Sequence, residues 1–205
     1  MNDSFNDKIV VITGGVRGIG KAIAHGFLKR GATVFATGRS NSRPLDLDAL
    51  IGYVPLDLES ELSLSGFLNF LTSLKRIDAI VNNAGINIIN ELPDIENADF
   101  DNILNINLRG PFIICKHVAK LMESGGKIVN IGSDLSVLAP NQDLYKDFSN
   151  FYKPPTYSVI KHGMLGMTKY FASLYSSSNV HVNMLSPGPI FNNHKNKFVN
   201  RLKKF

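Results

Sequence analysis

Cysteine is nearly absent from this sequence of 205 residues, which contains only Cys115. A single thiol excludes an internal disulfide and suits a protein of the reducing cytoplasm. Cys115 lies in a largely apolar run, where we expect it to be buried and to have no redox role. No apolar run approaches the ~20 residues of a membrane span. The first seven residues are polar and acidic, unlike a signal peptide. We therefore expect a cytoplasmic protein that does not enter a membrane.

Acidic residues are missing from the last twelve positions, 194–205, which hold five of the 22 basic side chains. The rest of the chain is balanced, with 17 basic and 17 acidic residues, so the formal charge of +5 comes from this one segment. The pattern predicts a solvated basic helix over 194–205, with cations favourably placed at its C-terminal end. Nucleic-acid binding by this helix is an alternative that charge alone leaves open.

A glycine-rich run, Thr13-Gly14-Gly15-Val16-Arg17-Gly18-Ile19-Gly20, is the most informative segment of the chain. The β-branched residues 8–12 before it predict a buried strand, and residues 21–28 after it have helical spacing. Glycines allow a tight turn and close approach of the backbone to a ligand. The N-terminus of the helix presents free N–H groups and a positive dipole end. Strand, glycine turn and helix together predict a dinucleotide phosphate site.

Strand and helix patterns alternate along the whole chain. Short apolar runs predict strands over 8–12, 33–37, 53–56, 78–82, 127–131 and 180–185. Helical spacing follows over 62–74, 98–122 and 157–175, whereas the link before the third strand is short, polar and interrupted by proline. Such alternation implies right-handed crossovers and a parallel sheet with helices on both faces. With 44% apolar residues, the chain fits one domain over 1–205. We predict an α/β fold, a doubly wound Rossmann-type sheet of six strands in the order 3-2-1-4-5-6.

The carboxyl ends of these strands are where such a fold binds its ligands. They carry recognisable motifs, namely Asp57, Asn82-Asn83-Ala84-Gly85, Asn105-Ile106-Asn107-Leu108, Ile131-Gly132-Ser133, Tyr157-x-x-x-Lys161 and Pro187-Gly188. In this order, and together with the glycine run, they resemble the classical short-chain dehydrogenase/reductase family through almost the whole chain. The resemblance implies an oxidoreductase that interconverts a carbonyl and a secondary alcohol. It also implies a homo-oligomer formed through the helices containing 98–122 and 157–175.

The resemblance implies a catalytic set of Asn107, Ser133, Tyr157 and Lys161, and no metal ion. Ser133 would hydrogen-bond the substrate oxygen and stabilise its developing charge. Lys161 would also hold the nicotinamide ribose, and Asn107 would position a water that links Lys161 to solvent. Taken singly, Ser133 fits better as a strand-end turn residue and Asn107 as a helix-kinking or capping amide, and only the full set favours the catalytic roles.

The Tyr157-x-x-x-Lys161 spacing has a chemical meaning on a helix, although by itself it equally describes a surface pair. Side chains four positions apart share one face, so the ammonium can approach the phenol. A phenol normally loses its proton near pH 10. A neighbouring cation, together with a positively charged nicotinamide, lowers that pKa. Tyr157 can then act as a general acid in reduction and as a general base in oxidation.

The end of the second strand indicates which cofactor is used. An acidic residue there would repel a 2′-phosphate, but the sequence is Ala36-Thr37-Gly38-Arg39-Ser40. Arg39 and Arg17 can pair with a phosphate, so we predict NADP(H) over NAD(H), unless these arginines are merely solvated. The resemblance adds that Asp57 contacts the adenine and that 83–85 line the cofactor with backbone. The predicted cofactor residues are Gly14, Arg17, Gly18, Ile19, Gly20, Arg39, Asp57, Asn83, Ala84, Gly85, Tyr157, Lys161, Pro187, Gly188, Ile190 and Asn192.

Three features depart from the family pattern. Ser133 and Tyr157 are 24 positions apart, more than is usual, so 134–155 reads as an insertion on the substrate side or as a plain surface insertion. After Pro187-Gly188, Asn192 stands in for a threonine that often touches the pyrophosphate. The sequence ends at position 205, where the family usually continues into a seventh strand, so we expect that strand to be missing.

The insertion and the Asn-rich ending are similar to short-chain reductases of bacterial surface-sugar pathways. A polar, sugar-like compound is therefore the first expectation for the substrate, and a 3-oxoacyl compound the second. The alternative from another class is a non-catalytic or truncated dinucleotide-binding module with a regulatory or scaffold role. The early end of the sequence favours that module, and the Asn-Ser-Tyr-Lys set favours an enzyme.

Overall fold

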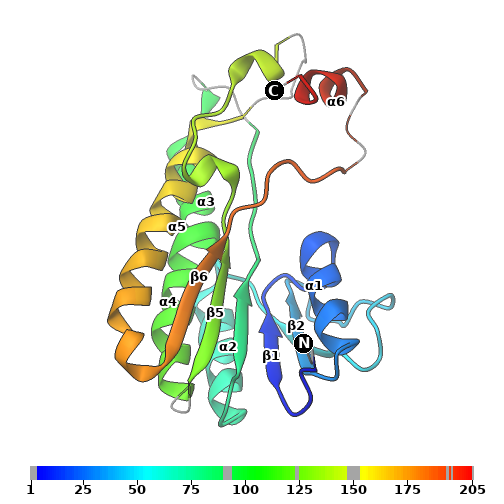
Figure 1. Ribbon diagram of the computed structural model, residues 1–205, viewed down its shortest axis with the longest axis vertical. Helices are drawn as coiled ribbons and strands as arrows, with labels where there is room; N and C mark the ends of the chain where they lie inside the picture. Colours follow the sequence, from blue (N-terminus) through cyan, green and yellow to red (C-terminus); the bar gives the residue numbers. More distant parts are fainter. Residues whose placement is uncertain are drawn as a thin grey trace.

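The computed structural model describes residues 4–89, 94–122, 125–146, 153–192, 194 and 196–204. Its centre is one parallel sheet in the order β3-β2-β1-β4-β5-β6, which confirms the predicted fold class and strand order (Figure 1). The strands are β1 Ile9–Ile12, β2 Thr33–Gly38, β3 Gly52–Pro55, β4 Ala79–Asn82, β5 Gly126–Ile131 and β6 Val180–Leu185. Each of these strands lies within two residues of its predicted position.

The helices connect these strands as crossovers. They are α1 Gly18–Leu28, α2 Glu61–Ser73, α3 Asn97–Leu104, α4 Gly110–Val118, α5 Pro155–Leu174 and α6 Asn196–Leu202. No helix joins β2 to β3, as the proline-interrupted link predicts. α6 lies within the basic segment predicted as a helix over 194–205, of which positions 195 and 205 fall outside the described residues.

The predicted helix over 98–122 is wrong in its continuity. A five-residue π-helix, Asn105–Arg109, separates α3 from α4, and a 3-10 turn, Ala119–Leu121, follows α4. The π-helix contains the fully buried Asn107. A π-helical turn inserts one residue into the helical ladder, and such turns are frequent at functional sites.

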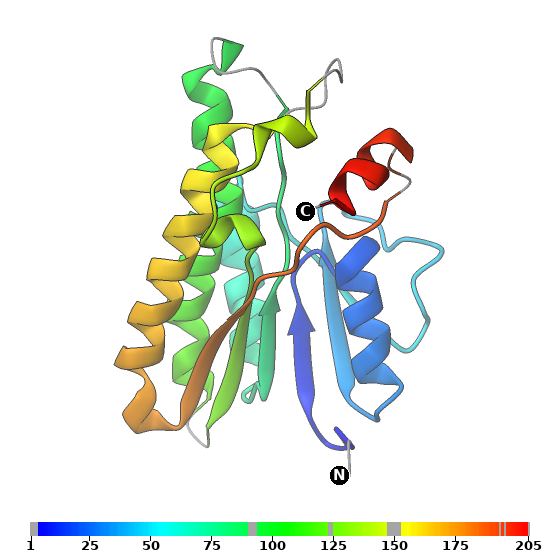
Figure 2. The same ribbon diagram turned by 45° about the horizontal axis from the view of Figure 1, so that its top comes forward.

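The sheet is buried on both faces because successive strand residues point to opposite sides. Val11 and Ile80 pack with α2, α4 and α5, whereas Val10 and Val81 pack with Ala24 of α1. Figure 2 shows α1 on one side of the sheet and α2, α4 and α5 on the other. Because all six strands are parallel, their carboxyl ends lie at one edge of the sheet, where the functional loops gather.

Three polar side chains within the core are linked by hydrogen bonds. Asn82 donates to Asn130 at 2.8 Å, and Asn130 donates to Thr168 of α5 at 2.9 Å. Cys115 is fully buried beside them, and burial raises the pKa of its thiol to about 12. The prediction of a buried cysteine is therefore confirmed, and the raised pKa disfavours its thiolate at neutral pH.

None of the helices within the described residues is long and apolar enough to cross a membrane.

Candidate active site

The turn between β1 and α1 needs its glycines. Gly14 and Gly18 adopt φ angles of +63° and +52°, which L-side chains rarely tolerate. A Cβ on Gly20 would lie 2.3 Å from the carbonyl oxygen of Gly14. A Cβ on Gly18 would meet nothing within 4 Å, so that residue borders open space. The turn is therefore tight on its inner side and open on its outer side.

The start of α1 is prepared for an anion. Arg17 occupies the N-cap position, but its side chain does not cap the helix, and the first turn has no acidic residue. The first amide N–H groups of an α-helix have no partner within the helix. Together with the positive end of the helix dipole, they form a phosphate site.

Hydrogen bonds tie this turn to the loop after β4. The Thr13 hydroxyl accepts from the backbone N–H groups of Asn83 and Ala84, each at 3.0 Å. The side-chain amide of Asn83 donates to the carbonyls of Thr13 and Gly14 at 3.0 and 3.1 Å. Thr37 accepts from the Gly14 N–H at 3.1 Å. The amide of Asn83 is thus used to shape the site, which leaves its backbone to line it.

A cleft of ≈ 1420 Å³ runs along this edge of the sheet. Twelve of the sixteen predicted cofactor residues line it, namely Gly14, Arg17, Gly18, Ile19, Gly20, Arg39, Asp57, Asn83, Ala84, Gly85, Ile190 and Asn192. Pro187, Gly188, Tyr157 and Lys161 do not. The Pro187 carbonyl instead accepts from the Asp134 N–H at 3.1 Å, so that this turn joins β6 to the segment after β5.

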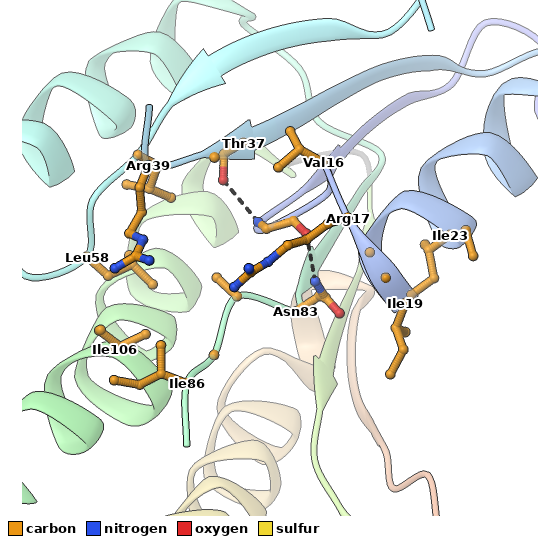
Figure 3. A pocket seen from close by; sticks show the side chains of 18 of the residues that line it. Val16, Arg17, Ile19, Ile23, Thr37, Arg39, Leu58, Asn83, Ile86 and Ile106 are labelled. Carbon is orange, nitrogen blue, oxygen red and sulfur yellow. Dashed lines mark hydrogen bonds between the residues drawn. The ribbon is translucent and has the colours of Figure 1, made fainter. Parts of the chain in front are cut away.

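The sequence predictions missed the apolar lining of the cleft. Leu56 and Leu58 follow β3, Ile86 follows β4, and Ile106 lies in the π-helix. Figure 3 shows Leu58, Ile86 and Ile106 on one side of the cleft. Leu58 and Ile86 each lie within two residues of a predicted site residue, so strand-end position was an available signal. Ile106 adjoins the predicted Asn107, but that motif was assigned to a continuous helix and not to a strand end.

Arg17 and Arg39 lie in two different loops but extend toward the same part of the cleft (Figure 3). Both are exposed. Neither guanidinium has a hydrogen bond or ion pair with any of the residues that the structure describes. Their donors are therefore available to an anion bound in the cleft.

Ser133 and Tyr157 meet beside this cleft. Ser133 follows β5 and caps a short 3-10 helix, Asp134–Ser136, by accepting from the Leu135 N–H at 3.2 Å. Burial raises the pKa of the Tyr157 phenol, a hydrogen bond with the Ser133 side chain lowers it, and the charge of Asp134 raises it again. The two residues predicted to act on one substrate oxygen thus lie close enough for Ser133 to influence the Tyr157 phenol.

Lys161 lies one helical turn after Tyr157 on α5 and is only 6% exposed. Its ammonium donates to the Ile131 carbonyl at 2.7 Å and lies 5.7 Å from the centre of the Tyr157 ring. Burial lowers its pKa from 10.5 to about 8. The structure therefore brings Ser133, Tyr157 and Lys161 together at the carboxyl end of β5.

Replacing Lys161 with methionine should remove a pH dependence of stability. Between pH 8 and 10 the unfolded chain holds a proton that the folded chain has largely lost, so the free energy of unfolding rises with pH. The difference in unfolding free energy between wild type and Lys161→Met should change by about 1.4 kcal/mol per pH unit in this range. Urea unfolding at several pH values measures it. A constant difference would contradict the lowered pKa.

Asn107 is fully buried, and both polar atoms of its side-chain amide are hydrogen-bonded. Its oxygen accepts from the Ile86 N–H and its nitrogen donates to the Ile86 carbonyl, both at 2.8 Å. This pairing fastens the π-helix to the chain that leaves β4. The side chain that was predicted to position a water is thus bonded to backbone through both of its polar atoms.

The observed features fit a dinucleotide. A ligand can approach the backbone of the glycine turn because no Cβ projects there. The N-terminus of α1, and two arginines without a partner among the described residues, supply donors for phosphates. The apolar side chains suit the flat faces of rings. Among the described residues, no three His, Cys, Asp or Glu side chains gather as metal ligands do.

Comparison with known proteins agrees with this geometry. The short chain dehydrogenase family model matches residues 8–202, so the chain belongs to this family. It is therefore an oxidoreductase that acts on CH–OH or C=O groups with NAD(P). A 3-oxoacyl-[acyl-carrier-protein] reductase of Aquifex aeolicus is 31% identical over 199 residues, which cover 92% of this chain and 76% of the relative.

Solved structures show the same fold with cofactors bound. A short chain dehydrogenase from Leptospira borgpetersenii with bound NAD+ has a TM-score of 0.86 at 26% identity, covering 97% of this chain and 78% of that one. A putative NAD(P) dependent gluconate 5-dehydrogenase from Beutenbergia cavernae with bound NADP has a TM-score of 0.82 at 27% identity. That match covers 100% of this chain and 80% of the other.

Proposed function

We propose that this protein interconverts a carbonyl and a secondary alcohol with NADP(H), and that Tyr157 is its general acid and base. The observation that carries the proposal is the meeting of Tyr157, Ser133 and Lys161 beside a glycine-lined cleft. A site that only bound a dinucleotide would not need a phenol, a hydroxyl and a buried ammonium gathered at the carboxyl end of β5. The non-catalytic module is therefore not favoured.

Each residue has a defined task in this mechanism. The bound nicotinamide supplies or accepts the hydride. The Ser133 hydroxyl, which donates to Asp134 in the structure, would turn its proton to the reacting oxygen and stabilise charge that develops there. Tyr157 gives a proton to this oxygen in reduction and removes it in oxidation. The Lys161 ammonium, fixed by the Ile131 carbonyl, stabilises the phenolate that results and holds the nicotinamide ribose.

Asn107 acts through the shape of the backbone. Because both polar atoms of its amide bind Ile86, the amide itself does not hold a relay water, and we propose that a backbone carbonyl of the π-helix would hold it instead. Such a water links Lys161, on the neighbouring α5, to solvent. The amide of Asn107 keeps the π-helix in place for this purpose.

The preference for NADP(H) rests on Arg17 and Arg39. A guanidinium forms charge-assisted, often bidentate hydrogen bonds with phosphate. No carboxylate follows Gly38 at the end of β2 to bind the ribose hydroxyls or to repel a 2′-phosphate. Asp57 lines the same cleft, where it would contact the adenine.

A polar, sugar-like compound is the first substrate class, and a 3-oxoacyl compound is the second. The Beutenbergia relative is described as a gluconate 5-dehydrogenase, and the Aquifex relative reduces a 3-oxoacyl group. The segment 134–155 borders the Ser133 and Tyr157 hydroxyls and shapes the substrate side, although 147–152 lie outside the described residues. Its polar side chains favour the sugar-like class.

We also propose a cytoplasmic homo-oligomer that forms through α4 and α5. These helices leave large hydrophobic side chains exposed, namely Phe112, Val159, Tyr170 and Leu174. Such side chains are typical of an interface.

The proposed activity is tested by following NADPH absorbance with a panel of carbonyl compounds, among them keto sugars and 3-oxoacyl thioesters. We expect consumption of NADPH that depends on one of these classes. Tight binding of NADPH without turnover of any member of the panel would favour the non-catalytic module instead.

A further inference from the structure

The segment between β5 and α5 places two opposite charges next to Tyr157. The Asp134 carboxylate directly follows Ser133 and accepts a hydrogen bond from its hydroxyl at 2.7 Å. The Lys153 ammonium lies 4.8 Å from the centre of the Tyr157 ring, closer than the 5.7 Å of Lys161. Neither charge has a task in the mechanism proposed above.

Lys153 is not fixed by an ion pair. It is half-buried, and with the described residues it makes no hydrogen bond and no salt bridge. Its ammonium lies over the face of the Tyr157 ring. Burial lowers the pKa of Lys153, and the charge of Asp134 partly offsets this lowering. A cation in this position is attracted to the ring and stabilises negative charge on it.

Asp134 is connected to the same phenol in two ways. It accepts a hydrogen bond from Ser133, which influences the Tyr157 phenol, and its own charge raises the pKa of that phenol. It also accepts from the Leu135 N–H at 2.8 Å, which fixes its position. Asp134 therefore opposes ionisation of Tyr157, whereas Lys153 favours it.

The surroundings of Tyr157 contain few other charges. Among the described residues, the charged groups facing it are Asp134 before the 3-10 helix, Lys153 before α5, and Lys161 on α5. Burial and the charge of Asp134 also raise the pKa of a second phenol, that of Tyr145. Within the part of the chain that the structure describes, the balance at Tyr157 thus depends on one anion and two cations.

We propose that Asp134 and Lys153 are positioning residues of opposite sign, and that Asp134 keeps the proton on Tyr157 while Lys153 limits this effect. The proposal rests on the role of Tyr157 given above. A protonated phenol is a general acid, so the pair sets the site for carbonyl reduction near neutral pH. Removing the anion shifts the site toward base catalysis, and removing the cation shifts it further toward acid catalysis.

The test is a titration of Tyr157 in the full chain, which needs no substrate. Phenolate absorbance is read within milliseconds of a pH jump, before alkaline unfolding, and the same curve from a Tyr157→Phe counterpart is subtracted. We expect Asp134→Asn to lower the midpoint by about 0.5 to 1.5 pH units and Lys153→Met to raise it by a similar or smaller amount. The double variant should fall between the two single variants.

Matched controls come from the same segment. Asp143→Asn and Lys146→Met remove exposed charges there and should leave the midpoint unchanged. Asp134→Ser, which keeps a short polar side chain without the charge, replaces Asp134→Asn if the amide does not fold. Midpoints that do not move in Asp134 and Lys153 variants, or that move in the same direction, would overturn the proposal.

Activity measurements separate this proposal from the proposed function. If NADPH is consumed and the midpoints stay fixed, the reaction stands and the charge pair fails. If the midpoints shift as expected and no carbonyl is turned over, the charge pair stands and the reaction fails. Where both hold, the pH profile of kcat/KM for reduction should move in the same direction as each midpoint.

Discussion

Tyr157→Phe is expected to lower kcat by about 10²- to 10⁴-fold, the range typical of a lost general acid or base. The ring remains in place, so its packing against Lys153 persists, and only the phenolic hydroxyl is lost. NADPH affinity should change little, because Tyr157 does not line the cleft. Steady-state kinetics and NADPH fluorescence titration measure the two quantities.

A matched control for this variant lies on the same helix. Tyr170 is on α5 and 62% exposed, away from the site. Tyr170→Phe should leave both kcat and NADPH affinity near wild-type values. Undiminished turnover in Tyr157→Phe would contradict the proposed mechanism, and equal losses in both variants would indicate damage to α5.

Removing the two cleft arginines should reverse the cofactor preference. A hydrogen bond to a charged group contributes about 1.5–3 kcal/mol, so Arg17→Ala with Arg39→Ala should weaken NADPH binding by about 10²-fold or more. NADH lacks the 2′-phosphate, so its affinity should fall much less. Isothermal titration with both cofactors measures the ratio.

Arg30→Ala is the control for the loss of positive charge. Arg30 is exposed just beyond the other end of α1 and donates to the Gly26 carbonyl at 3.0 Å. This variant should leave the ratio of NADPH to NADH affinity unchanged. Equal weakening of both cofactors by the Arg17 and Arg39 substitutions would contradict a 2′-phosphate site.

Much of the fold could be predicted because the strands are buried on both faces. Runs such as residues 9–12 and 79–82 are apolar and short, and the loops that follow them carry the glycines and asparagines of the site. Strand order followed from the alternation of strands with helices and from the doubly wound rule. In these segments the local sequence pattern favours the same element that the whole fold requires, so the pattern alone was enough to predict the element.

The parts that escaped prediction depend on contacts distant in sequence. The π-helix at Asn107 pairs with Ile86, 21 positions earlier, and nothing in helical spacing signals that pairing. The apolar side of the cleft likewise combines Leu58 with Ile106. Asp134 and Lys153 were visible only as members of a long insertion, because their approach to Tyr157 depends on how that insertion folds.

The most direct test of the central claim is thermal unfolding of the purified chain, alone and with saturating NADPH or NADH. A ligand at about 100 times its Kd adds about 2.7 kcal/mol to stability. For a chain of this size that corresponds to a rise in Tm of roughly 5–10 °C. The account predicts one cooperative transition that NADPH raises more than NADH. A transition that neither cofactor moves would contradict a dinucleotide site in the cleft, and with it the proposed reaction.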